Sequence, residues 1–98
     1  MASSREYLEH ILDGLPAGNV RYRPMMGEFI LYYRGVIVGG IYDDRLLVKP
    51  TPAAAAYLSG ARLETPYEGG KPMLLVENVD SGEFLTGLFE SMTGNTAR

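Results

Sequence analysis

The residues whose types could do chemistry are few. His10 is the only histidine, and no sequence pattern places a serine nucleophile and a carboxylate beside it as in a catalytic triad. Asp43 and Asp44 could act as an acid–base pair or hold a hard cation. Adjacent strand residues point to opposite faces, however, and no spaced third oxygen ligand follows them. We therefore interpret this pair as turn residues.

Two further segments resemble ligand-binding sequences. Gly69-Gly70-Lys71 matches part of a phosphate-binding loop, but Pro72 stands where that motif requires serine or threonine, so a turn is expected. A basic and aromatic group could stack on single-stranded nucleic acid. Its members are Arg21, Tyr22, Arg23 and Tyr32. The chain carries a net charge of −3, which disfavours nucleic acid and favours a solvated strand face with core tyrosines.

Composition limits the class of protein. The 98 residues are 46% hydrophobic and 21% charged, which is typical of one globular domain over 1–98. The absence of cysteine excludes disulfides and thiolate metal sites. No apolar run approaches the roughly 20 residues of a membrane span, and the first residues lack a signal-peptide pattern. We expect a cytoplasmic protein that does not enter the membrane and needs no cofactor.

The first half of the chain predicts a helix followed by a β-meander. A capping box of Ser3 and Glu6 starts the helix, which ends before Pro16. Strands are expected over 20–25, 29–33, 36–42 and 45–49. The first should either end at its proline, which cannot donate to a ladder, or lie at an edge. We expect a three-residue loop around Gly35, a bulge or close approach at 39–40, and a type I turn at 43–44.

The second half predicts two helices and one strand. Thr51 should cap a short helix over 53–58, with Pro52 at its first position. Residues 62–71 are expected to form a loop, and 73–77 a strand. Asp80 or Ser81 should cap the last helix, with Glu83 completing a capping box, and 93–98 should be a flexible tail. The fold class is α+β, in two layers, with a mainly antiparallel sheet and helices at both termini.

Several short motifs together resemble the N-terminal domain of the TfoX competence regulators. The motif residues are Arg23, Met25, Gly27, Gly35, Asp43, Asp44, Leu46, Lys49, Tyr67, Lys71 and Pro72. The resemblance runs from about residue 20 to residue 92. It implies a small α+β fold of the secretion-chaperone-like kind, often dimeric, with no established catalytic residues.

Our leading hypothesis is a non-enzymatic regulatory or adaptor domain that acts through protein–protein contacts, as a homodimer or with an unidentified protein partner. A meander that is apolar on both sides leaves surface to cover. The interface is expected either on the terminal helices or on the sheet, where the candidate residues are Phe29, Leu31, Tyr33, Val36 and Val38. The alternative is a small-ligand-binding or enzymatic domain, with its site near 25–28, 43–45 and Lys71.

Overall fold

The computed structural model describes residues 5–93 and contains nine helices and strands within that range. They are α1 (Arg5–Asp13), β1 (Val20–Met25), β2 (Glu28–Tyr33), β3 (Val36–Ile41), β4 (Leu46–Val48), α2 (Pro52–Leu58), β5 (Leu63–Glu64), β6 (Met73–Val76) and α3 (Gly82–Thr93). The expected capping box at Ser3 lies outside the described residues, as does most of the expected tail. Thr93 is the last residue of α3 and not the start of a tail.

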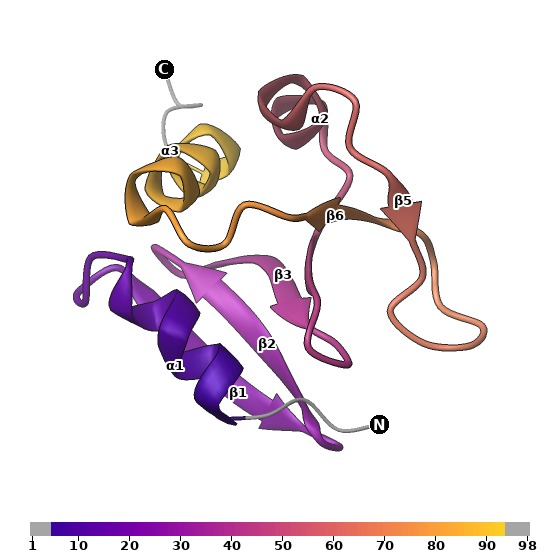
Figure 1. Cartoon of the computed structure of the whole chain (residues 1–98), viewed down its shortest axis with the longest axis horizontal. Helices are drawn as coiled ribbons and strands as arrows, with labels where there is room; N and C mark the ends of the chain where they lie inside the picture. The colour runs from indigo at the N-terminus through magenta and orange to yellow at the C-terminus, as the bar shows by residue number, and fades with distance from the viewer. Residues whose placement is uncertain (1–4, 94–98) are drawn as a thin grey trace.

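The strands form one antiparallel sheet in the order β1-β2-β3-β4-β6-β5, with the three helices gathered over one of its faces (Figure 1). This arrangement confirms the predicted two-layer α+β class. The proline of β1 does lie on an edge strand, opposite Phe29. The expected loop over 62–71 was wrong at its start, because Leu63 and Glu64 pair with Leu74 and Met73.

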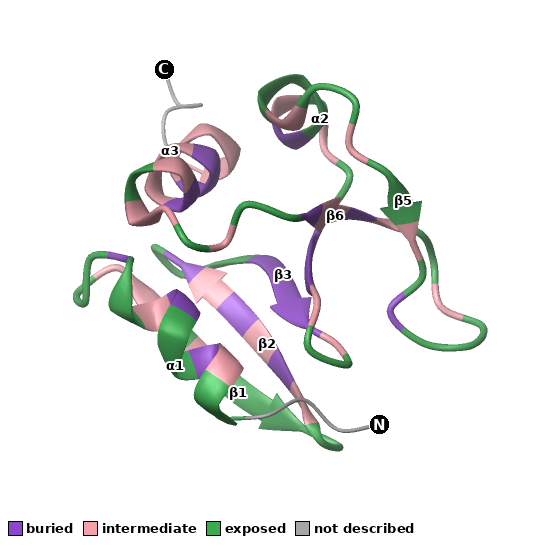
Figure 2. Cartoon of the chain, in the orientation of Figure 1, coloured by how far each residue is buried: buried purple, intermediate pink, exposed green. Residues whose placement is uncertain are grey.

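The hydrophobic core fills the space between the helices and one face of the sheet. Burial alternates along β2, as a strand with one covered face requires (Figure 2). Its buried residues face α1 and α3, which supply Leu8, Ile11, Leu85, Leu88 and Phe89 to the same cluster. The more specific expectation, that the fold is of the secretion-chaperone-like kind, stays a prediction.

The core corrects the expected interface. Four of its five residues have 8% or less of their surface exposed and pack under the helices: Phe29, Leu31, Tyr33 and Val38. Only Val36 is open to solvent, at 46% exposure. The sequence pattern identified apolar strand residues correctly, but the chain's own helices cover them, so a partner cannot reach them in this fold.

Three hairpins, β1–β2, β2–β3 and β3–β4, close through two-residue turns whose residues have positive φ. The pairs are Met26-Gly27, Arg34-Gly35 and Asp43-Asp44. Such turns match the right-handed twist of the flanking strands. The predicted three-residue loop at Gly35 and the predicted type I turn at Asp43 were therefore wrong. Short polar side chains tolerate left-handed backbone at Asp43 and Asp44. Arg34 needs other support.

Arg34 receives that support from the end of α3. Its guanidinium donates from Nε and Nη2 to Glu90 Oε2 at 3.1 and 2.9 Å, and its backbone nitrogen donates to the Asn19 carbonyl at 2.7 Å. The buried Tyr33 hydroxyl donates to the same Glu90 oxygen at 2.7 Å. These contacts fix a residue that rarely adopts positive φ. They also lower the pKa of the Glu90 carboxyl, first through Tyr33 and then through Arg34.

Glu90→Gln should lower the free energy of unfolding near neutral pH and have little effect in acid. A carboxyl whose pKa is lower in the folded state stabilises the fold above its unfolded pKa, and that contribution disappears as pH falls through the folded value. Urea unfolding near pH 7 and below about pH 3 measures this. Glu77→Gln, on a carboxylate 75% exposed, is the control. An equal loss at both pH values contradicts the account.

Two glycines in β3 confirm the expected bulge and close approach. Pairing runs Leu31 to Gly39 but Tyr32 to Ile37, so the register shifts between them. A Cβ on Gly39 would lie 2.7 Å from Val48 Cα, and one on Gly40 would lie 2.6 Å from the Phe29 carbonyl oxygen. Adjacent strands on both sides thus fill the space that a side chain would need.

Helix caps were predicted in part. Thr51 Oγ1 accepts from the Ala54 nitrogen at 3.2 Å, as expected, with Pro52 at the first helical position. At α3, Ser81 Oγ accepts from the Phe84 nitrogen at 3.1 Å and is the cap. Asp80 instead accepts from His10 at 2.7 Å, which links the segment before α3 to α1. No helix in residues 5–93 is both long enough and apolar enough to cross a membrane.

Candidate binding face

The face of the sheet opposite the helices is only partly covered. Cross-strand partners share a face, so the residues opposite one another in register locate it. They are Met25 and Glu28, Arg23 and Ile30, Gly40 with Leu47 and Leu75, and Met73 with Glu64. Leu47 is fully buried yet lies outside the main core cluster. Something other than the helices must therefore shield it.

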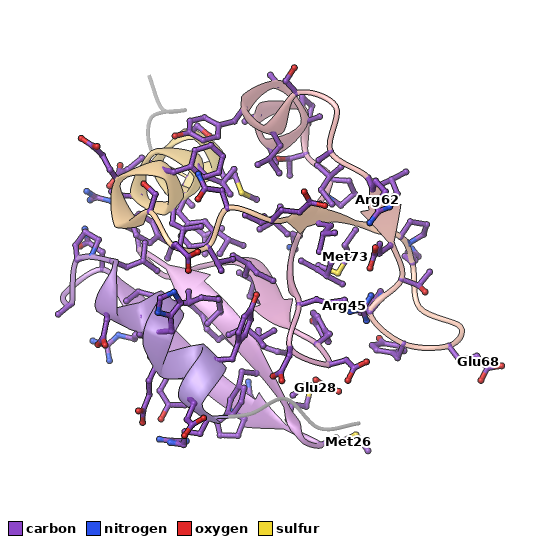
Figure 3. All side chains as sticks on the ribbon, viewed as in Figure 1. Met26, Glu28, Arg45, Arg62, Glu68 and Met73 are labelled. Atoms are coloured by element: carbon purple, nitrogen blue, oxygen red, sulfur yellow. The ribbon has the colours of Figure 1, made fainter. Side chains whose placement is uncertain are left out.

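Arg45 holds the 65–72 loop against the β3–β4 hairpin. Arg45 Nη1 donates to Glu64 Oε1 at 2.7 Å, Nε to the Tyr42 carbonyl at 3.1 Å, and Nη2 to the Pro66 carbonyl at 3.4 Å. Figure 3 shows Arg45 and Met73 near the centre of the view, with the loop that carries Glu68 to their right and Met26, at the tip of the β1–β2 hairpin, below them. One guanidinium thus joins three segments.

Two tyrosines form the centre of this surface. The Tyr42 and Tyr67 rings meet edge to face with centroids 6.3 Å apart, a favourable aromatic geometry. Tyr67 is 62% exposed. Burial raises the pKa of Tyr42, and the nearby Tyr67 and Glu28 raise it further. A raised pKa keeps the Tyr42 phenol protonated near pH 7, which suits contact better than general-base chemistry.

Three hollows adjoin Tyr67. The largest, about 850 Å³, also takes in Lys49, Lys71 and Met73. One of about 620 Å³ lies toward Glu28 and Glu68, and one of about 430 Å³ lies toward Met25 and Met26. We call the apolar surface around them the tyrosine face. It consists of Met25, Met26, Ile30, Tyr42, Tyr67 and Met73.

Charge is divided across the tyrosine face. Lys49 and Lys71 border the largest hollow, and a second hollow that shares Tyr67 is bordered by Glu28, Asp43, Arg45 and Glu68. Asp43, Lys49, Glu68 and Lys71 are exposed, and within residues 5–93 none of these four side chains takes part in an ion pair. By contrast, Arg45 is paired with Glu64. Exposed charges of both signs thus border the hollows that adjoin Tyr67.

The motif residues divide into two groups. Gly27, Gly35, Asp43 and Asp44 form turns with positive φ, and Leu46 is in the core, so these five specify the fold. The others gather at or beside the tyrosine face: Met25, Lys49, Tyr67, Lys71 and Pro72 line its hollows, and Arg23 lies on its β1 side, 3.5 Å from the Tyr32 hydroxyl. The Tyr42–Tyr67 pair and the Arg45 contacts were missed, because only the fold reveals that residues 42–45 meet 64–67.

The other candidate sites, at His10 and at the glycine-rich segment, are not assembled into a catalytic or phosphate-binding arrangement in the described residues. His10 and Asp80 form an exposed pair at 2.7 Å on the helix side. Gly69 has a φ of +85°, and the Gly70 nitrogen donates to the Tyr67 carbonyl at 2.9 Å, so this segment is a turn as expected. Among the described residues, no three His, Asp or Glu side chains come close enough to hold a metal ion.

Arg45→Met should lower the free energy of unfolding by about 1–3 kcal/mol, because it removes charge-assisted hydrogen bonds from a half-buried site. Arg62→Met is the matched control. Arg62 approaches the same Glu64 carboxylate, at 3.7 Å, but is 70% exposed, so its removal should cost less than about 0.5 kcal/mol. Chemical denaturation measures both. Equal losses would show that Arg45 does not anchor the loop.

The fold and this face together define a small two-layer α+β domain that presents a tyrosine-centred surface beside its covered core. The chain belongs to the TfoX N-terminal domain family, whose model matches residues 11–79. It is 32% identical over 80 residues to an uncharacterised 12.7 kDa protein in the trpE 5′ region of Spirochaeta aurantia, across 81% of this chain and 70% of that protein. No solved structure matches the chain significantly. Neither the description of the family nor that of the relative names an enzymatic activity.

Proposed function

We propose that this chain is a non-enzymatic regulatory or adaptor domain that works by binding protein, including a second copy of itself, through the tyrosine face. The observation that carries the proposal is the exposure of large apolar side chains on the sheet face that the helices leave open. Tyr67 is 62% exposed, Met25 44% and Met26 96%. Tyrosine and methionine are enriched at protein interfaces, and clustered exposure of this kind marks contact surfaces.

The chemistry of the same surface supports contact over catalysis. The polar groups that border the hollows are tyrosines, lysines, carboxylates, Arg45 and the Thr65 hydroxyl, without a histidine or cysteine. The only histidine lies on α1, which packs on the opposite face. A nucleophile with an adjacent base is the usual requirement for covalent catalysis, and the tyrosine face does not bring such a pair together.

Photocrosslinking in cells tests the proposal. A benzoylphenylalanine in place of Tyr67 should form a protein adduct, either with a second copy or with another protein. The same group in place of Glu9, whose side chain is 63% exposed on α1, should form none. Adducts from neither position, or equally from both, would contradict a contact function for the tyrosine face.

A second candidate function is the binding of a small anionic ligand with an apolar body. The observation that favours it is the hollow of about 850 Å³ that joins Tyr42, Tyr67 and Met73 to two lysines. Ligand pockets commonly have volumes of this order and combine an apolar lining with a few polar groups. Thermal-shift measurements with aromatic carboxylates and nucleotides test it. Stabilisation that Lys71→Ala abolishes would support this candidate, and no shift with any of them would exclude those classes.

A further inference from the structure

The outer edge of β1 is a row of backbone groups that no hydrogen bond occupies within residues 5–93. β1 is the first strand of the sheet and pairs with β2 alone, alongside α1 (Figure 1). The Arg34 nitrogen donates to the Asn19 carbonyl at 2.7 Å, and bonded pairs alternate along an antiparallel ladder. From Arg21 onward, every second residue of β1 therefore bonds to β2. The other residues of the strand point their backbone groups outward: Val20, Tyr22 and Pro24.

Pro24 supports this assignment. It pairs with Phe29, whose carbonyl oxygen would lie 2.6 Å from a Cβ on Gly40 of β3. The backbone of Phe29 therefore turns toward β3, and the N–H that Pro24 lacks would have pointed to the outer edge of β1. Proline is tolerated at such edge positions because no ladder bond is lost. Val20 and Tyr22 each offer a donor and an acceptor at this edge, and Pro24 offers an acceptor alone.

Contacts with α1 and β2 fix the shape of this edge. The Tyr22 ring packs edge to face on Phe29, with centroids 5.8 Å apart. The Tyr22 hydroxyl accepts from Arg5 Nη2 at 2.6 Å, and the Arg5 guanidinium carbon lies 5.4 Å from the centroid of the same ring. An edge that is already ordered loses little conformational freedom when another strand joins it. Such edges are a common way for a domain to bind an extended peptide.

The side of this edge that faces away from the helices is basic. Arg21 and Arg23 point there, since the residue between them packs on the core and neighbours alternate along a strand. Both are exposed, and neither takes part in an ion pair within the described residues. Arg23 reaches the Tyr32 hydroxyl at 3.5 Å. Glu28 lies at the far end of the hairpin, opposite Met25. On this side a strand added to β1 meets arginines at alternate positions.

The side of the edge that faces the helices suits apolar residues. A hollow of about 450 Å³ lies between the end of α1 and the start of β1, and its lining includes Leu12, Ala17 and Val20. Asp13 also borders it, so an acidic side chain would meet a like charge there. Glu9, earlier on α1, lies 3.7 Å from Arg5. Uncharged, apolar side chains therefore fit the helix side of the edge better than acidic ones.

A second copy of β1 fits this edge poorly. Antiparallel pairing of two β1 strands around Tyr22 would place Arg21 of each copy opposite Arg23 of the other, and like charges directly opposite destabilise a sheet. Pro24 of the added strand would also lack the donor that the ladder needs. Charged side chains and proline commonly protect edge strands against self-addition. The same arginines leave the edge open to a strand of opposite charge.

We propose that the outer edge of β1 binds an extended protein segment in which acidic residues alternate with apolar ones. The segment joins the sheet antiparallel to β1 and bonds to the outward backbone groups of Val20, Tyr22 and Pro24. Its acidic side chains face Arg21 and Arg23, and its apolar side chains lie toward α1. This edge is a second contact surface, and the proposal does not rest on contacts made by the tyrosine face.

Labelled peptides test this proposal by fluorescence anisotropy at physiological salt. The peptide Glu-Val-Glu-Val-Glu-Val-Glu should bind at least about tenfold more tightly than its lysine counterpart, or than a permuted peptide with its valines together. The chain itself has a net charge of −3, so overall charge would favour the lysine peptide instead. A preference for the glutamate peptide must therefore come from a local basic site.

Backbone methylation shows whether the peptide binds as a strand. In antiparallel addition the valine nitrogens donate to β1 and the glutamate nitrogens face solvent. Methyl groups on the valine nitrogens should therefore abolish binding, whereas methyl groups on the glutamate nitrogens should change the affinity by less than about twofold. The reverse pattern would contradict the antiparallel direction, and equal affinity of all three peptides would exclude strand addition.

Charge reversal tests the role of the arginines. Arg21→Glu with Arg23→Glu should weaken binding of the glutamate peptide at least about tenfold and create binding of the lysine peptide, which also shows that the variant is folded. Arg62→Glu is the control. Its side chain is 70% exposed just before β5, at the opposite end of the sheet, so the affinity should change by less than about twofold.

Three further results would overturn the proposal: no binding of the alternating glutamate peptide, equal binding of the alternating and permuted peptides, or unchanged binding in the variant without the two arginines. None of these would remove a crosslink from position 67 to another protein. Failure of the β1 edge as a peptide site can therefore be distinguished from failure of the tyrosine face as a contact surface.

Discussion

Gly39→Ala should lower the free energy of unfolding by about 3 kcal/mol or more, near the upper end for an overpacked core. The added Cβ would meet the Leu47 carbonyl and would lie 2.7 Å from Val48 Cα. Both atoms belong to the β4 backbone, which cannot rotate away as a side chain can. Relief would require β3 and β4 to separate in the middle of the sheet. For a domain of this size, the melting temperature should fall by more than about 10 °C.

Gly18→Ala is the matched control for that substitution. A Cβ on Gly18 would meet no atom within 4 Å, and this glycine does not have a positive φ. Alanine there should leave the free energy of unfolding unchanged or raise it by about 0.4–1 kcal/mol, because it restricts the unfolded chain. Calorimetry compares the two variants. If Gly39→Ala melts within a few degrees of Gly18→Ala, the close approach of β3 and β4 is not as tight as described.

Tyr67→Ala should weaken self-association by about 2 kcal/mol or more, which raises the dimer dissociation constant about 30-fold. Tyr67 contacts Tyr42 with its ring edge and borders all three hollows of the tyrosine face. An aromatic ring at the centre of an interface buries much area with little loss of conformational freedom. Sedimentation equilibrium measures the dissociation constant.

Tyr67→Phe separates the ring from its hydroxyl and should keep most of the affinity. Both variants should have melting temperatures within a few degrees of that of the unsubstituted chain, since a mostly exposed side chain contributes little to stability. Unchanged association in Tyr67→Ala, with the fold intact, would remove Tyr67 from the interface. A large loss in Tyr67→Phe would place the binding energy in the hydroxyl instead.

Local sequence signals predicted most of the fold. Pro24 indicated the edge strand, Gly39 and Gly40 the bulge, and Thr51 with Pro52 the start of α2, because each depends on backbone chemistry within a few residues. The turn at Arg34 could not be predicted in this way. Its positive φ depends on Glu90, which is 56 residues away in sequence and is brought there by α3.

The candidate site was harder to predict than the fold. Because β2 is apolar at every position from Phe29 to Tyr33, its sequence cannot say which face the helices will cover, and so the expected interface at Leu31 and Tyr33 fell on the core side. The motif residues Lys49, Tyr67 and Lys71 line one hollow, but their convergence depends on the contacts of Arg45 with Glu64 and Pro66. Such long-range contacts leave no periodic trace in the sequence.

Amide chemical shifts measured by NMR during dilution test the central claim most directly, since they locate the contact surface without any substitution. If the tyrosine face is the surface through which the chain associates, the shifts should change at residues 25–28, 42–49 and 64–73. Those of α1 and α3 should stay constant. Shift changes confined to the helix side, or none across the range in which the mass changes, would contradict the account.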